Sequence, residues 1–410
     1  MPSHRTDRAR SFFLLASLVA TAACGSTAGP GGAASSGTTG SGGAGSATSS
    51  STGRVGVGGG ASTSASTGSS SSGAVLDGGA CNAQLADFSA SHWPPACYPF
   101  YAPTSFWNTP IAPSPALDPS SAAILTFYAN NYHGFVGLGA LSLGDPDSTQ
   151  AFDHPLYFAD ASDPLFTLHC TESAWGTCTL EGKQIHVPSG AQHADGTDGH
   201  MGIVDTTSGI EYDMWQVTAV PTSAGGTLSC SWGGYGSFTG PGFTTSGGGA
   251  TASGASLGAG TIRSEELIAG QINHVLFGVV SCCNGTAVGA SAMYGGHCDT
   301  KCVNNQGGAV GQVYMLNMTD AEIDALGKSP AATAILKALA HYGFMDSDES
   351  AYAVGLLATS PTYERTSLGA TDPIVAWAKA QGLPSDGNGG YTLDYGTDID
   401  WASKLVVLAP

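Results

Sequence analysis

Charged side chains are scarce in this chain, and positive charge is scarcest. The 410 residues include 12 Lys and Arg against 31 Asp and Glu, and charged residues make up 10% of the sequence, where about 25% is usual. Four of the Arg and one Asp precede residue 77, so the remainder has 8 basic and 30 acidic side chains and a net charge of −22. Such a surface repels polyanions. Nucleic acid is therefore excluded as a partner, and a polyuronate is disfavoured.

Residues 1–24 have the pattern of an export signal. Three Arg precede the apolar run Phe12–Ala23, and small residues lead to Cys24. The segment Leu18–Cys24 is similar to a bacterial lipobox, although Thr21 stands where Leu is usual. We expect an exported protein that is either lipid-anchored at Cys24, facing the periplasm or cell surface, or secreted after ordinary cleavage.

Residues 25–76 are nearly all Gly, Ser, Ala and Thr, which predicts a disordered linker with a span of ~40 Å. The folded part is then 77–410. Short alternating runs broken by Gly and Pro predict strands over 133–220. Helix signals follow, among them the capping box Thr319–Glu322 and the start Ser329-Pro330. We expect a mainly β fold, a β-sandwich or jelly roll, with a helical C-terminal portion.

Nine cysteines follow Cys24, and in an exported chain they predict disulfide bonds. The expected pairs are Cys81–Cys97, Cys170–Cys178 and two more bridges within the cluster Cys282, Cys283, Cys298 and Cys302. Because nine is odd, one thiol is left over, and Cys230 is the candidate. The alternative for the cluster is a structural zinc site that also uses His297.

The densest group of ionisable residues lies between His193 and Trp215, where two His and five carboxylates occur in 23 residues. Alternation predicts a hairpin of Met201–Asp205 and Ile210–Val217 around a four-residue turn. In a symmetric register Gly202 faces Asp213. One sheet face then carries the side chains of His200, Glu211, Asp213 and Trp215. We expect this face to line an open cleft for a carbohydrate.

Each polar residue on this face has a candidate role. Asp213 is the first candidate for a catalytic carboxylate, with Asp198, Glu211 or Asp195 as the second, because two carboxyl groups flank the bond that glycosidases cleave. His200 is the candidate base or positioning group. Trp215 is expected to stack on a sugar ring. The alternative is an ordinary solvated sheet face with Asp195 and Asp198 in turns.

Three further residues are candidates for substrate binding. Trp107 and Asn108 lie in a Pro-flanked loop, and His274 follows a predicted helix. Exposed, Trp107 would be a sugar platform; buried, it would anchor the core. The spacing of His193, His200 and the nearby Asp residues matches no metal motif, so we expect no cofactor. The alternative is a calcium ion, which would suit the many acidic side chains.

Several segments resemble a family of uncharacterised exported actinobacterial and myxobacterial proteins. They are Ser105–Pro110 (SFWNTP), Val187–Ala191, Gly196–Met201 (GTDGHM), Asp213–Trp215, Gly249–Ser253, Glu266–His274 and Tyr342–Asp346. The resemblance covers most of 100–350 in order, and it implies homology without assigning an activity. The relatives have Glu where this chain has Asp213.

The sequence thus predicts a monomeric, exported enzyme that hydrolyses glycosidic bonds of an extracellular polysaccharide. One alternative is a polysaccharide lyase, in which His200 removes a proton beside a uronate carboxyl that Asn108, His274 or a metal neutralises. Another is a lipid-tethered glycan-binding protein without catalysis. The acidity favours hydrolysis of a neutral glycan over elimination.

Overall fold

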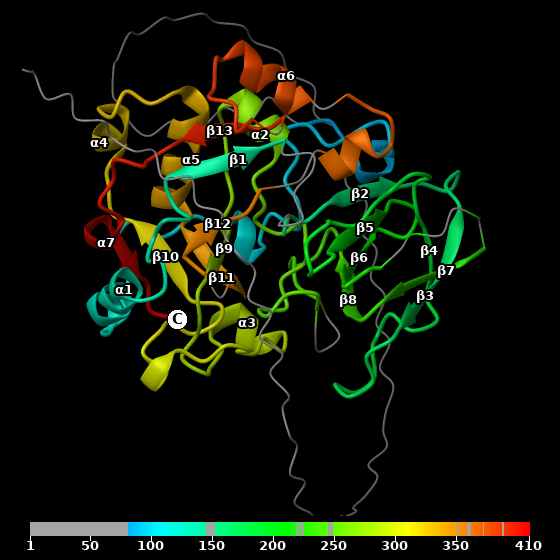
Figure 1. Ribbon diagram of the computed structural model, residues 1–410, viewed down its shortest axis with the longest axis horizontal. Coiled ribbons are helices and arrows are strands. Elements are labelled where there is room, and N and C mark those ends of the chain that lie inside the picture. Colours follow the sequence, from blue (N-terminus) through cyan, green and yellow to red (C-terminus); the bar gives the residue numbers. More distant parts are fainter. Residues whose placement is uncertain are drawn as a thin grey trace, which may run out of the picture. The chain divides into compact units, whose positions relative to one another are not determined.

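Four small sheets form the framework of the part of the chain that the structure describes (Figure 1). The computed structural model describes residues 81–144, 152–218, 220, 223, 225–244, 249–350, 352–358, 362–371, 373–387 and 389–410. The expected export signal, Cys24 and linker lie outside these residues. The strands are interspersed with helices, so the content is mixed α/β, and no jelly-roll sandwich is present among the described residues. The predicted β-sandwich or jelly roll is therefore wrong.

The predicted hairpin is confirmed within a four-stranded sheet of order β2-β5-β6-β8. Its strands are β2 (Leu156–Ala159), β5 (Met201–Asp205), β6 (Ile210–Trp215) and β8 (Trp232–Ser237). Asp205 pairs with Ile210 and Gly202 with Asp213, as the symmetric register predicts. The turn closes through a bond from Gly209 N–H to the Asp205 carbonyl (2.8 Å), and Gly209 has a positive φ of 69°. That backbone conformation favours glycine.

One face of the hairpin packs against a second, three-stranded sheet. This sheet has the order β4-β3-β7, with β3 (Leu165–Cys170), β4 (Gln184–His186) and β7 (Thr227–Cys230). Met201, Ile203 and Met214 of the hairpin share a hydrophobic cluster with Phe166 and Leu228 of this sheet. The alternating pattern therefore identified the correct residues for this side of the core.

The larger core lies around a five-stranded sheet of order β12-β9-β11-β10-β14. Its strands are β9 (Leu276–Val280), β10 (Val313–Leu316), β11 (Phe344–Glu349), β12 (Gly355–Leu356) and β14 (Leu405–Val407). The remaining strands, β1 (Ala140–Leu143) and β13 (Tyr391–Asp394), pair with each other. β9 and β11 are parallel, and Leu276 pairs with Phe344, although residues 281–343, which include three α-helices, lie between the two strands in sequence. Local patterns do not predict such a pairing.

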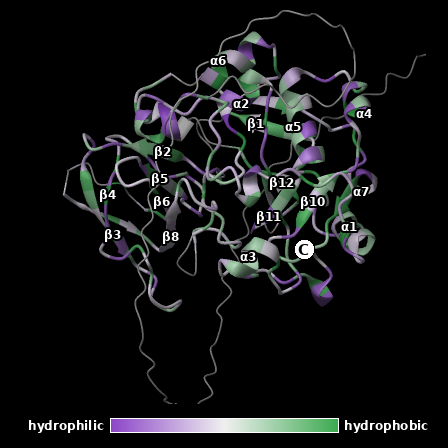
Figure 2. Ribbon diagram, turned by 180° about the vertical axis from the view of Figure 1, so that it is seen from behind, coloured by the Kyte–Doolittle hydropathy of each residue, from purple (hydrophilic) through white to green (hydrophobic). Residues whose placement is uncertain are grey.

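Helices occur along the described part of the chain, and in the C-terminal portion they alternate with strands β10 to β14, so this portion is not helical alone as the sequence predicted. The helices are α1 (Ser121–Asn130), α2 (Ser264–Ala269), α3 (Gly289–Met293), α4 (Asp320–Asp324), α5 (Pro330–His341), α6 (Pro373–Ala380) and α7 (Trp401–Lys404), with short helical turns η1 (Leu85–Asp87), η2 (Phe106–Asn108), η3 (Val303–Asn305) and η4 (Thr362–Thr366). Thr319 forms the predicted capping box with Glu322, and Ser329 caps α5. Figure 2 shows both hydrophobic and hydrophilic residues on α5, which buries one face in the core.

The predicted disulfide bonds are confirmed. The bridges are Cys81–Cys97, Cys170–Cys178, Cys282–Cys302 and Cys283–Cys298, and Cys230 is a buried free cysteine. Because both pairs of the cluster are bridged, no thiolates are left for the alternative zinc site. Four disulfides are typical of an oxidising extracellular environment. Among the described residues, no helix has the length and apolar character needed to span a membrane.

Gly233 offers a test of how closely β8 approaches β6. A Cβ atom at this position would lie 2.1 Å from the Asp213 carbonyl oxygen and 2.5 Å from Leu180 Cδ1. We predict that Gly233→Ala lowers the free energy of unfolding by about 2 kcal/mol or more, because the backbone carbonyl has no room to move. Ser237→Ala on the same strand is the control and should cost under ~0.5 kcal/mol. Denaturant unfolding of both variants gives the comparison, and equal stability of the two would contradict this packing.

Candidate active site

Ionisable residues from four parts of the chain gather around one Gly-rich segment, residues 249–258. His154 precedes β2, His200 precedes β5, Glu211 and Asp213 lie in β6, and Asp348 lies in β11. Each of these side chains makes a hydrogen bond to a peptide group of the segment. We call these five residues and the segment the acid–imidazole cluster.

Glu211 and Asp213 form a buried carboxyl pair, and both are 0% exposed. Glu211 accepts hydrogen bonds from the Tyr101 hydroxyl and from Gly258 N–H, each at 2.8 Å, and Asp213 accepts one from Leu257 N–H at 3.2 Å. Burial raises the pKa of Glu211 to about 7. Burial and the charge of Glu211 raise the pKa of Asp213. The pair therefore retains a proton near neutral pH.

The expectation that this sheet face is open is wrong. Segment 249–258 covers Glu211 and Asp213, and Gly258 allows the close approach, since a Cβ atom there would lie 3.1 Å from Glu211 Oε1. The shared hydrogen bonds hold the cover in place. A glycan has no access to either carboxyl group here, so the role of the pair is structural: it holds the covering segment in place.

His200 and His154 lie edge to face, with their ring centroids 4.6 Å apart. His200 Nε2 donates a hydrogen bond to the Ala250 carbonyl at 3.1 Å, so a neutral ring has its lone pair on Nδ1. That Nδ1 has no hydrogen-bond partner among the described residues. Burial lowers the pKa of both imidazoles. His200 is therefore a neutral ring with an unused basic nitrogen, although its side chain is only 3% exposed.

Asp348 is the partly exposed member of the cluster, and Asp198, also partly exposed, lies next to the cluster without belonging to it. Asp348 accepts hydrogen bonds from Ala252 N–H at 3.3 Å and from Glu349 N–H at 2.9 Å. Burial raises the pKa of Asp348 to about 7, and the negative charge of Asp198 adds to the effect. The same Asp198 charge opposes the lowering of the His200 pKa. Asp198 is thus within electrostatic reach of both.

Two Trp rings lie beside Asp198. Trp215 is half-buried, and its Nε1 donates to Asp198 Oδ1 at 3.4 Å. Trp175 stacks on Trp215 with a centroid distance of 5.5 Å and is 59% exposed. Stacked, exposed Trp rings beside carboxylates provide a surface for a sugar ring. The sequence predicted Trp215 in this role and missed Trp175, which lies within the Cys170–Cys178 loop.

The backbone explains why Asp198 reaches Trp215. Gln216 N–H donates to the Asp198 carbonyl at 2.7 Å and Val217 N–H to the Gly199 carbonyl at 3.0 Å, which extends the hairpin beyond its ladder. Gly199 has a positive φ of 46°, and a Cβ atom there would lie 2.9 Å from the Val217 carbonyl oxygen. The Asp-Gly pair is therefore required by this close turn.

Trp107, Asn108 and His274 lie together elsewhere, around a cavity of about 60 Å³. That volume holds a few water molecules. Trp107 is 1% exposed, and its Nε1 donates to the Gly242 carbonyl. Asn108 donates to the carbonyl groups of residues 100 and 102. The structure thus places Trp107 in the core and gives Asn108 a role in fixing the loop.

His274 belongs to an ionic network at the same cavity. Its Nε2 lies 3.2 Å from the Glu266 carboxylate, which also pairs with Arg263 at 2.6 Å. The Arg263 and His274 charges outweigh burial and hold the pKa of Glu266 at about 2. Arg263 also donates to the Tyr98 carbonyl at 3.1 Å. The network joins α2, β9 and the 95–108 segment, and it leaves no polar group of Glu266 free for substrate.

Segment 249–258 contains Gly254-Ala-Ser256-Leu-Gly258, which has the spacing of a serine-hydrolase nucleophile elbow. An elbow exposes the serine oxygen at a strand-to-helix turn. Here Ser256 is 1% exposed, and its hydroxyl interacts with Tyr101 and Asp213. The geometry does not support a serine nucleophile.

One group of described residues has the spacing of metal ligands, and it lies outside the acid–imidazole cluster. It consists of Cys283, Cys298 and Glu349, whose ligand atoms are within 4.8 Å of one another. Because the two sulfurs are joined in a disulfide, they are not available as thiolates. Among the described residues, no other group of three or more His, Cys, Asp or Glu has such spacing.

Comparisons of the chain with protein-family models, with curated proteins and with solved structures found no match.

The carboxyl pair makes stability depend on pH. The pKa of Glu211 is about 7 in the folded chain, against 4.5 ordinarily. The contribution of Glu211 to the free energy of unfolding is therefore complete below about pH 4.5 and is lost as the pH rises through 7. We predict that Glu211→Gln flattens the fall in melting temperature between about pH 5 and 8. The raised pKa of Asp348 also makes the melting temperature fall with rising pH, and this part of the fall remains in Glu211→Gln. The exposed Asp400→Asn is the control, and an unchanged slope in Glu211→Gln would refute the shared proton.

Proposed function

We propose that the chain is an exported enzyme that hydrolyses glycosidic bonds of a neutral extracellular polysaccharide. The observation that supports this most directly is the position of Asp198, beside the Trp215–Trp175 stack and within electrostatic reach of Asp348 and His200. Sugar-stacking rings and proton-transfer groups are the two components that glycoside hydrolysis needs. We also propose that Cys24 carries a lipid anchor, with the linker as a tether.

The proton-transfer roles follow from the ionisation of each group. Asp348, with a pKa of about 7, is protonated in a large fraction of molecules at neutral pH and serves as the acid for the leaving oxygen. Asp198, which is partly exposed, stabilises the positive charge that develops on the sugar ring, and His200, whose Nδ1 is buried, is a positioning group for segment 249–258 rather than the base. Asp213 and Glu211, the first candidates from the sequence, instead hold segment 249–258 in place.

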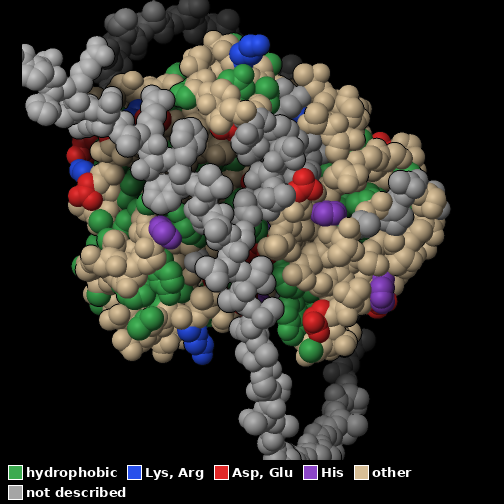
Figure 3. Space-filling view, viewed as in Figure 1, with side chains coloured by type: hydrophobic (Ala, Val, Ile, Leu, Met, Phe, Trp, Pro, Cys, Tyr) green, Lys and Arg blue, Asp and Glu red, His purple; other side chains and the backbone are tan. Residues whose placement is uncertain are grey.

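The charge of the chain supports a neutral substrate. The acid–imidazole cluster contains three carboxyl groups and no Lys or Arg. The two Arg of residues 77–410 are both paired elsewhere, Arg263 with Glu266 and Arg365 with Glu265. On the face drawn in Figure 3, Lys and Arg side chains are few and scattered. A uronate carboxylate would find no positive partner at the cluster, which disfavours the lyase alternative.

The segments that resemble the family of exported proteins also support a site at the acid–imidazole cluster. Three of the shared segments, Gly196–Met201, Asp213–Trp215 and Gly249–Ser253, meet in the acid–imidazole cluster. We propose that the chain belongs to the family of exported actinobacterial and myxobacterial proteins and that this cluster is its working site.

Asp348→Asn tests the acid role. We predict that it lowers kcat by roughly 100-fold or more on any polysaccharide that the wild-type chain cleaves, because the amide cannot give a proton to the leaving group. A panel of neutral and acidic polysaccharides, read by reducing ends and ultraviolet absorbance, identifies the substrate and separates hydrolysis from elimination. Asp400→Asn is the matched control. Full activity of Asp348→Asn would refute the assignment, and binding without cleavage by wild type would favour the glycan-binding alternative.

Trp175→Ala tests the stacking surface independently. We predict that KM rises roughly tenfold while kcat changes less than about twofold, because the ring contacts the sugar and no reacting atom. Val136→Ala provides the control, since Val136 is also exposed, at 65%. Initial-rate kinetics on the identified polysaccharide separate the two constants. A fall in kcat with unchanged KM would contradict the role given to Trp175.

A further inference from the structure

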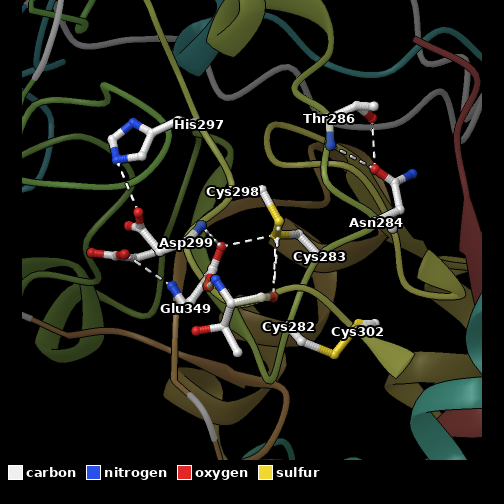
Figure 4. The surroundings of a disulfide bond; sticks show 12 residues. Cys282, Cys283, Asn284, Thr286, His297, Cys298, Asp299, Cys302 and Glu349 are labelled. Atoms are coloured by element: carbon white, nitrogen blue, oxygen red, sulfur yellow. Dashed lines mark hydrogen bonds and ion pairs between the residues drawn. A yellow bond between two sulfur atoms is a disulfide. The ribbon is translucent and has the colours of Figure 1, made fainter. Parts of the chain in front are cut away.

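The Cys283–Cys298 disulfide has the carboxyl group of Glu349 against one of its two sulfurs (Figure 4). Cys283 is 0% exposed, and Glu349 Oε1 lies 2.9 Å from its Sγ. Cys298 is partly exposed. The two ends of this disulfide therefore differ in both accessibility and chemical surroundings.

Glu349 also holds the loop that carries Cys298. Its carboxylate accepts hydrogen bonds from the backbone N–H groups of Asp299, at 2.9 Å, and Thr300. A disulfide sulfur has no proton to donate, so the close contact with Cys283 favours a protonated carboxyl. Burial raises the pKa of Glu349, which agrees with that state.

Two of the other three disulfides, Cys282–Cys302 and Cys170–Cys178, lack this arrangement. Cys282 and Cys302 are 0% and 3% exposed and lie within the large hydrophobic cluster. Cys170–Cys178 has a carboxylate nearby, but Glu181 accepts a hydrogen bond from the backbone N–H of Cys170 at 2.8 Å and is fully solvent-exposed. Neither bridge combines an accessible sulfur with a proton donor at its partner.

We propose that Cys283–Cys298 is an exchangeable disulfide that reacts with low-molecular-weight thiols at the Cys298 sulfur. The incoming thiolate forms a new S–S bond to Cys298 as the Cys298–Cys283 bond breaks. The electron pair leaves with Cys283, and the Glu349 carboxyl gives its proton to that thiolate. A second thiolate then attacks the sulfur that the first low-molecular-weight thiol contributed to the mixed disulfide. This step releases the small-molecule disulfide and leaves Cys298 as a thiolate. This inference is independent of the proposed activity.

The direction of attack follows from the same contacts. Cys283 is enclosed, so a thiol reaches only Cys298 in the folded chain. Exchange is also faster when the leaving thiolate is stabilised, and protonation by Glu349 achieves this for Cys283 alone. Both features select one product, a mixed disulfide on Cys298 with a free thiol at Cys283.

Reaction of the oxidised full chain with glutathione tests this. After acid quenching and alkylation, peptide mapping should show glutathione on Cys298 and an alkylated Cys283, with Cys282–Cys302 intact. We expect Glu349→Gln to slow this exchange roughly tenfold, because the amide gives up no proton, and Glu349→Asp to retain part of the rate.

Glu181→Gln is the matched control and should change the rate of exchange at Cys170–Cys178 less than about twofold. Near-ultraviolet circular dichroism checks that each variant is folded. Glutathione on Cys283, an unchanged rate in folded Glu349→Gln, or equally fast reaction of Cys282–Cys302 would overturn the proposal. If Glu349→Gln does not fold, the position of the adduct in the wild-type chain decides.

Discussion

The arrangement of this protein depends on hydrogen bonds between one Gly-rich segment and the ionisable side chains it covers. Peptide groups of residues 249–258 bond to His154, His200, Glu211, Asp213 and Asp348. A buried polar group is costly without a partner, so each of these bonds stabilises both the side chain and the cover. The bonds also fix the His200 tautomer and thereby determine which ring nitrogen carries the proton.

The sequence predicted the hairpin correctly and its surroundings incorrectly, for one physical reason. Alternation along β5 and β6 determines which side chains share a face, and the register Gly202–Asp213 followed from the turn length. Whether a face is open depends on what lies over it. The covering segment is more than 30 residues away in sequence and contains no ionisable side chain. Its contribution comes from backbone groups, which have no sequence signature beyond glycine content.

The same distinction applies to the rest of the chain. Helix caps and short-range disulfides are local, and they were predicted correctly at Thr319, Ser329, Cys81–Cys97 and Cys170–Cys178, while the pairing within the 282–302 cluster was left open. The division of strands into four sheets depends on long-range pairs such as β9 with β11, so the sandwich prediction failed. Asp348 and Trp175 joined the candidate site only through such contacts, since neither lies near the hairpin in sequence.

The most direct test of the central claim is the protonation state and tautomer of His200, measured by nitrogen-15 NMR of the labelled chain near pH 7. The hydrogen bond from Nε2 to the Ala250 carbonyl predicts a neutral ring with its proton on Nε2 and a pKa below the ordinary value. His154 should be neutral with its proton on Nδ1, which faces the Leu257 carbonyl. A His200 ring that is charged at this pH, or protonated on Nδ1, would contradict the cover and the role given to this residue.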